Sequence, residues 1–167
     1  MYKVGMIGGS YNPLHNGHVR AIKKALTVVD ELHIIIGNIP NMDDVSIQTK
    51  LKWFKILFKD YGNRIVLHTL YDDRHDKSEY TLDKWVKDST RIKSMIGKHI
   101  DVVFCGSDYN RPDNPYKVCY KEQRIVYVDR SDGISSTDFK KDIKAHKDWV
   151  PDIVYQTYMR KFKGGVG

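Results

Sequence analysis

Short apolar runs and longer amphipathic segments alternate along the chain. Five of the runs are rich in β-branched residues and too short for buried helices, so we predict that each is a strand of a parallel sheet covered on both faces. A strand, a helix and a second strand within about the first forty residues form a βαβ unit, which is right-handed by default. The predicted strands are Val4–Ile7, Glu31–Gly37, Arg64–Leu70, Ile100–Cys105 and Arg124–Asp129.

The amphipathic segments predict helices between these strands. The first segment has an apolar face made of Val19, Ile22, Ala25, Leu26 and Val29. Further helices are predicted over about 48–60, 81–96 and 134–144, and after Pro151. We assign residues 1–163 to a single α/β domain and residues 164–167 to a flexible tail.

The segment Gly8–His18 carries the densest candidate chemistry, because it follows the first predicted strand and opens the first helix. Glycines let a backbone approach a ligand closely, and a helix N-terminus favours phosphate. His15 and His18 can donate hydrogen bonds to phosphate oxygens. The segment therefore predicts a nucleotide-phosphate site, and a tight turn with surface histidines is the alternative. The candidate nucleotide-binding residues here are Gly9, Ser10, Tyr11 and Gly17.

Two motifs resemble a known family. Gly9–His18 is similar to the G-x-F-x-P-x-H-x-G-H signature of the nucleotidyltransferase superfamily, which includes cytidylyltransferases, NMN adenylyltransferases and pantetheine-phosphate adenylyltransferases; Tyr11 replaces the usual Phe. Ile134–Lys140 is similar to I-S-S/T-T-x-x-R, with Lys140 in place of the Arg. Lys keeps the positive charge but loses the bidentate fork. The resemblance implies a Rossmann-like, doubly wound, five-stranded parallel sheet of order 3-2-1-4-5 with a C-terminal helical segment.

That strand order would bring three segments to one edge of the sheet. Ligands bind outside the carboxyl ends of such strands, where the chain direction reverses between the first and fourth strands. After the fourth strand, Gly106, Ser107 and Asp108 suit recognition of ribose or base, and an ordinary turn is the alternative. After the fifth, one hydroxyl suffices to cap the helix, so the surplus favours phosphate binding. The residues of that helix start are Ile134, Ser135, Ser136 and Thr137.

The chemistry that the resemblance implies is nucleotidyl transfer. A phosphate on the second substrate attacks the α-phosphorus of a nucleoside triphosphate, and pyrophosphate leaves. Catalysis is then mainly alignment and charge stabilisation. His15 and His18 would donate to the α- and β-phosphates, while Ser136, Thr137 and Lys140 would hold the pyrophosphate. Mg²⁺ would be held mostly by substrate and water, so no protein metal ligand is predicted.

The second substrate is predicted from two further positions. In relatives, a basic residue at the place of Lys50 reaches the outer phosphates or the second substrate, and a solvated helix residue is the alternative. NMN adenylyltransferases stack an aromatic side chain on the nicotinamide ring, and Trp85 lies in the corresponding part of the chain. Packing in the core is the alternative for Trp85.

Two subfamilies compete for the substrate. Arg130–Thr137 resembles the R-x-x-G-I-S-T-T stretch of glycerol-3-phosphate-type cytidylyltransferases. Asp30–Gly37, Leu51–Trp53 and Trp149–Pro151 resemble the adenylyltransferase domain of bacterial bifunctional NMN adenylyltransferase/ribosylnicotinamide kinases. We predict an NMN adenylyltransferase that uses ATP. The alternatives are a cytidylyltransferase that uses CTP and, from another class, a non-catalytic nucleotide or RNA-binding protein.

Charge and cysteine content bear on the partners, metal sites and location of the protein. The 167 residues carry a net charge of +7, which suits a nucleotide or a nucleic acid, so charge alone does not choose between them. We expect no nucleic-acid partner, because a pure binder would have no need of both His15 and His18. Cys105 and Cys119 lack the spacing of a metal site, and Asp72–Ser78 is predicted to be a solvated polar loop. No apolar run reaches the ~20 residues of a membrane helix, and the N-terminus has no signal-peptide form. We therefore expect a cytoplasmic enzyme that can form a homo-oligomer.

Overall fold

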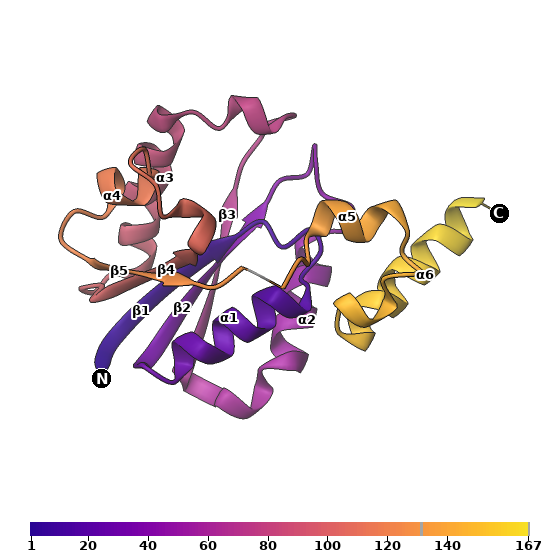
Figure 1. The fold of residues 1–167 in the computed structure, drawn as a ribbon, viewed down its shortest axis with the longest axis horizontal. Coiled ribbons are helices and arrows are strands. Elements are labelled where there is room, and N and C mark those ends of the chain that lie inside the picture. Colours follow the sequence, from indigo (N-terminus) through magenta and orange to yellow (C-terminus); the bar gives the residue numbers. More distant parts are fainter. Residues whose placement is uncertain (131, 167) are drawn as a thin grey trace.

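The sheet has the predicted order. The computed structural model describes residues 1–130 and 132–166. Its five strands pair in parallel in the order β3-β2-β1-β4-β5 (Figure 1). The doubly wound sheet is thus confirmed, and each predicted strand overlaps an observed one. The strands are β1 (Tyr2–Gly9), β2 (Val29–Asn38), β3 (Ile65–Tyr71), β4 (Val102–Gly106) and β5 (Arg124–Val128).

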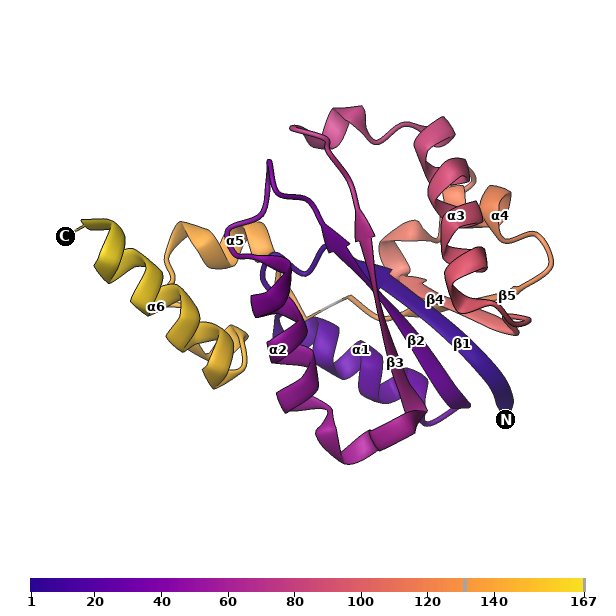
Figure 2. The same ribbon diagram turned by 180° about the vertical axis from the view of Figure 1, so that it is seen from behind.

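Helices cover both faces of the sheet. The helices are α1 (Asn16–Leu26), α2 (Ile47–Leu57), α3 (Leu82–Ile96), α4 (Pro115–Cys119), α5 (Ser136–Lys141) and α6 (Asp152–Val166). The pair α1 and α2 lies on one face, and α3 and α4 lie on the other (Figures 1 and 2). None of the helices in the described ranges is both long and apolar enough to cross a bilayer.

Alternation along the strands supplies two separate cores. Ile7 and Phe104 point to the α1–α2 face, whereas their neighbours Met6 and Val103 point to the α3–α4 face. This alternation explains why the strands read as continuous apolar runs, since both faces are buried. The predicted stripe of the first helix was one residue too long, because the helix ends at Leu26 and Val29 opens β2.

The C-terminal helices pack on the α1–α2 side. Phe139 of α5 and Tyr158 of α6 are both fully buried there, and their rings meet edge to face with centroids 5.5 Å apart. Helix α5 ends at Lys141, three residues before the predicted end. Helix α6 continues through residues 164–166, where we predicted a flexible tail, and residue 167 lies outside the described residues.

Candidate active site

A cleft of about 500 Å³ opens at the carboxyl ends of the strands. It combines residues from the loop after β1, the ends of β4 and β5, the start of α5, and α3. The predicted site residues that line it are Gly9, Ser10, Tyr11, His15, Gly17, His18, Trp85, Gly106, Asp108, Ser135, Ser136 and Thr137. The lining does not include Lys50, Ser107, Ile134 or Lys140. The three segments therefore meet, although four of the predicted side chains lie outside the cleft.

The two histidines cap the first turn of α1 and fix each other. The backbone N–H of His15 donates to His18 Nδ1 at 3.1 Å, and the backbone N–H of His18 donates to His15 Nδ1 at 3.3 Å. The rings stack with centroids 3.6 Å apart. Because each Nδ1 accepts a hydrogen bond, the proton of each neutral ring is on Nε2. Both imidazoles therefore have an Nε2–H donor that is free of the cap.

Burial keeps both imidazoles neutral. Desolvation, followed by the positive charge of Arg130, lowers the pKa of His15 to about 4. Desolvation, followed by the neighbouring His15, lowers the pKa of His18 well below its usual value. At neutral pH the pair thus acts through hydrogen bonding and the dipole of α1, without a formal charge of its own.

We expect His15 to titrate with a midpoint near pH 4 in an NMR experiment, well below the ~6.5 of a histidine in an unstructured peptide. The folded chain then binds fewer protons than the unfolded chain between these two values. The free energy of unfolding should therefore fall as the pH falls from about 6.5 towards 4. A His15 midpoint above pH 6 would contradict the buried, neutral assignment.

Tyr11 and Gly17 shape the space around the histidines. The Tyr11 ring is 2% exposed and meets the rings of His18 and Phe54 edge to face, each at 4.9 Å between centroids. A Cβ at Gly17 would lie 2.7 Å from Asp132 Oδ2 and 2.8 Å from His15 Cε1. A Cβ at this position would have to displace the Asp132 carboxylate or the His15 ring, so the glycine leaves room for the His15 ring in its capping position.

The hydroxyls of the α5 start have separate partners. Ser135 Oγ accepts from the backbone N–H of Asp138 at 3.0 Å and caps the helix. Ser136 Oγ donates to the carbonyl of Pro13 at 2.9 Å, which ties α5 to the loop after β1. The Ser136 proton is therefore engaged, while Thr137 remains a cleft-lining residue. One of the hydroxyls not needed for the cap, that of Ser136, thus joins the start of α5 to the loop after β1.

Both predicted lysines are held by carboxylates. Lys140 Nζ lies 2.9 Å from Asp44 Oδ2, and the same oxygen accepts the Tyr158 hydroxyl at 2.7 Å. Lys50 is fully buried and lies 2.8 Å from Asp43 Oδ2. The expected contacts of these lysines with phosphate or acceptor therefore find no support in the observed geometry, because both ammonium groups have protein partners.

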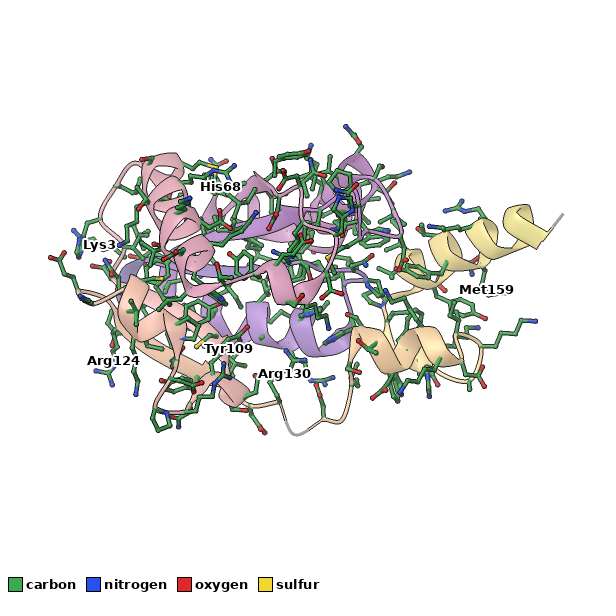
Figure 3. All side chains as sticks on the ribbon, turned by 90° about the horizontal axis from the view of Figure 1, so that it is seen from above. Lys3, His68, Tyr109, Arg124, Arg130 and Met159 are labelled. Carbon is green, nitrogen blue, oxygen red and sulfur yellow. The ribbon has the colours of Figure 1, made fainter. Side chains whose placement is uncertain are left out.

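An arginine provides positive charge at the end of the cleft that holds the two histidines. Arg130 follows β5, lines the cleft, and lowers the pKa of both His15 and His18. Its backbone N–H donates to Ser107 Oγ at 3.1 Å, whereas its Nε is buried without a hydrogen-bond partner. Figure 3 shows Arg130 between the strand end marked by Arg124 and the C-terminal helix marked by Met159. A guanidinium next to two neutral imidazole donors makes this end of the cleft suitable for phosphate.

The far end of the cleft is aromatic. Trp85 of α3 is half-buried and meets Tyr80, Tyr109 and Tyr116 edge to face at 5.0–6.0 Å between centroids. The Tyr80 hydroxyl donates to Asp88 Oδ2 at 2.7 Å. Trp85 thus packs against the core on the α3–α4 side, as the alternative predicted, and it also gives this end of the cleft an aromatic wall.

Asp72 is the buried exception in the loop after β3, where residues 73 and 75–78 are exposed as predicted. Its carboxylate is 4% exposed and lies 2.6 Å from both Arg74 Nη1 and Lys84 Nζ. Burial alone would raise the pKa of Asp72, but hydrogen bonds from Lys84 and the Arg74 backbone outweigh it and lower the pKa. The Arg74 guanidinium in turn lies 4.4 Å from the Tyr80 ring centroid. Asp72 and Arg74 therefore form an ion-paired part of the cleft wall near the aromatic end.

Comparison with known proteins identifies the family. The profile of the Cytidylyltransferase-like family matches residues 6–150, which include every segment of the cleft. The chain belongs to this family.

Individual relatives are distant in sequence. Phosphopantetheine adenylyltransferase of Mycoplasma mycoides subsp. mycoides is 27% identical over 124 residues, covering 65% of this chain and 88% of that enzyme. The trifunctional NAD biosynthesis/regulator protein NadR of Escherichia coli is 25% identical over 120 residues, covering 65% of this chain and 29% of NadR. A bifunctional NMN adenylyltransferase/ADP ribose pyrophosphatase from Francisella tularensis, solved with AMP and a Mn ion, has a TM-score of 0.68 at 20% identity. That match covers 90% of this chain and 44% of the other, and it shows the fold.

In this family member, the sequence analysis missed several cleft residues. Arg130 was considered only as part of a motif, and Tyr80 and Asp88 were not considered at all. The signal for Arg130 was present, because a basic residue directly after the fifth strand must lie at the edge where ligands bind. No comparable signal marked Tyr80 or Asp88, since their place depends on how α3 packs against the sheet.

Proposed function

We propose that the protein is an adenylyltransferase that transfers AMP from ATP to nicotinamide mononucleotide, forming NAD and pyrophosphate. The observation that carries the proposal is one continuous cleft with two kinds of wall. Neutral histidine donors and Arg130 line one end, and aromatic side chains around Trp85 line the other. A dinucleotide product has the same division into phosphates and a flat ring. The names of the relatives, which include NMN and nicotinate-nucleotide adenylyltransferases, support this assignment.

In the proposed mechanism, the acceptor phosphate attacks the α-phosphorus, and the bond to the pyrophosphate oxygen breaks. A phosphate is already an adequate nucleophile, so the protein needs to align the reactants and stabilise charge. His15 and His18 donate through Nε2–H to phosphate oxygens as charge develops, and the dipole of α1 adds to this stabilisation. Arg130 neutralises the leaving pyrophosphate.

Magnesium would enter with the triphosphate. No group of three or more His, Cys, Asp or Glu that could hold a metal occurs within 1–130 and 132–166. The imidazole and guanidinium donors of His15, His18 and Arg130 suit the phosphates of MgATP, and phosphates and water would then provide most of the metal ligands.

The decisive experiment measures pyrophosphate release with Mg²⁺ while ATP and CTP are each combined with four acceptors. The acceptors are NMN, nicotinate mononucleotide, glycerol 3-phosphate and phosphopantetheine. Release only with ATP and NMN would support the proposal. Release only with CTP would favour a cytidylyltransferase, the alternative that the family profile and the Arg130–Thr137 motif support. Nucleotide binding without release for every pair would favour a binding protein.

We expect Trp85→Ala to raise the KM for NMN by roughly tenfold or more, because stacking on an aromatic ring contributes about 1–3 kcal/mol. The KM for ATP should change much less, since Trp85 lies at the aromatic end. Trp85→Phe retains a flat ring and is the matched control. If Trp85→Ala instead raised the KM for ATP and left that for NMN unchanged, the orientation of the two substrates in the cleft would be reversed.

A further inference from the structure

The buried ammonium of Lys50 makes three contacts with the protein. Lys50 Nζ donates to the carbonyl of Ser10 at 2.7 Å and to the carbonyl of Gly37 at 2.8 Å, and it lies 2.8 Å from Asp43 Oδ2. An ammonium has three donor protons, so these acceptors use all of them. The side chain is fully buried, and it is absent from the cleft lining. Lys50 therefore has no donor left for a ligand.

The two carbonyls belong to segments that form the cleft. Ser10 follows β1, Gly37 lies near the end of β2, and both residues line the cleft. The segments approach closely, since a Cβ at Gly37 would lie 3.2 Å from Ser10 Cα and 3.5 Å from the Gly9 carbonyl oxygen. Carbonyls that converge on one point would repel each other without a cation between them. Lys50 thus fixes how the loop after β1 sits against β2.

Asp43 fixes the ammonium in turn. Its Oδ2 also accepts the backbone N–H of Ile39 at 2.8 Å, which anchors the carboxylate to the loop after β2. The Asp43 side chain is 3% exposed, so removing Lys50 alone would leave a buried negative charge without its partner. A test of Lys50 must therefore neutralise Asp43 as well.

The orientation of the Ser10 carbonyl has a consequence for the cleft. The Ser10–Tyr11 peptide is trans, so its N–H points away from its carbonyl and hence away from Lys50. We propose that Lys50 is a positioning residue, which clamps this peptide so that the Tyr11 N–H faces the α-phosphate of the bound nucleotide. This inference rests on the proposed nucleotidyl transfer, but the burial of Lys50 can be tested without it.

The first test is chemical labelling of lysines in the native protein, with and without MgATP, read by mass spectrometry. Lys52 lies on the same helix and is exposed, so it is the matched control. We expect acetic anhydride to label Lys50 at least about tenfold more slowly than Lys52 in both states, because a buried amine reacts only on local opening. Labelling of Lys50 at the rate of Lys52, or protection of Lys50 only when MgATP is added, would overturn the inference.

The second test compares the double variant Asp43→Asn/Lys50→Met with Lys52→Met. A misplaced reacting group can cost about a hundredfold in rate, so we expect kcat of the double variant to fall by about that factor. The KM for ATP should rise by only about threefold, because Lys50 does not touch the nucleotide and the Tyr11 N–H is one of several phosphate donors. A raised KM with unchanged kcat would identify a ligand contact and overturn the inference, as would wild-type kinetics in a folded double variant.

The two tests separate the inference from the proposed function. If none of the tested pairs of nucleotide and acceptor gives pyrophosphate, the proposed function fails. The clamp of the Ser10–Tyr11 peptide by Lys50 is then tested by lysine labelling and by ATP binding measured with calorimetry. The clamp then requires a slow-labelling Lys50 and a double variant that binds ATP more weakly than Lys52→Met, since the Tyr11 N–H is lost as a phosphate donor. Equal ATP binding by the two variants would overturn it.

Discussion

Replacing His18 with asparagine should lower kcat by about two to three orders of magnitude, close to 3 kcal/mol of transition-state stabilisation. The asparagine Oδ1 lies near the place of His18 Nδ1, so it can still accept the backbone N–H of His15 and preserve the helix cap. What the variant lacks is a donor in the place of Nε2–H. Since that donor acts on charge that develops during the reaction, kcat should fall more than the KM for ATP rises.

A second substitution separates the donor from the cap. Glutamine can place its amide nitrogen near Nε2, so His18→Gln should retain more activity than His18→Asn while it loses part of the cap and some stability. His99, whose side chain is 69% exposed and which precedes β4, provides the control variant His99→Ala. Steady-state pyrophosphate release and thermal unfolding of the three variants give both readouts. Near-normal turnover of His18→Asn would exclude the proposed role of the imidazole donor.

The strands and helices could be predicted because the patterns that define them lie within short stretches of sequence. Runs such as Ile34–Ile36 must be buried on both faces, and glycines and polar residues mark the strand ends. The strand order was implied by the resemblance, since apolar runs alone do not define which strands are neighbours. The errors are at element ends, as for Val29, where a helix and a strand are separated by only two residues.

The sequence predicted which segments form the site, but it did not predict which partners the individual side chains contact. His15 and His18 were recognisable because a helix start constrains both backbone and side chain. Lysines differ, since their long side chains reach partners far away in sequence. Lys140 pairs with Asp44, 96 residues before it, and only the packing of α5 and α6 brings the two together. The basic character of a motif position therefore does not identify the ligand of its ammonium.

Arg130 and Lys140 differ in how well each is placed to contact phosphate. Arg130 lies close enough to the histidines to lower their pKa values, and its Nε is buried without a hydrogen-bond partner. Lys140 lies outside the cleft lining and is neutralised by Asp44. The motif position predicts Lys140 as the phosphate ligand, whereas we propose the larger contribution for Arg130.

We therefore expect Arg130→Met to lower kcat/KM by about two to three orders of magnitude, because it removes a charge-assisted donor from a partly desolvated phosphate site. Lys140→Met should cost about tenfold or less, since Lys140 lies outside the cleft lining and its ammonium is already paired with Asp44. The two variants change the net charge equally, so any difference between them reflects position.

The Arg130 variant also has an effect that does not depend on turnover. The guanidinium is the second cause of the low pKa of His15, so its removal should move the His15 midpoint upward from about 4. The shift should be partial, because desolvation is the larger cause and remains. An NMR titration of His15 in Arg130→Met and Lys140→Met would show the shift in the first variant alone. An equal shift in both, together with an equal loss of kcat/KM, would place Lys140 beside the histidines and exclude the ranking drawn from the cleft.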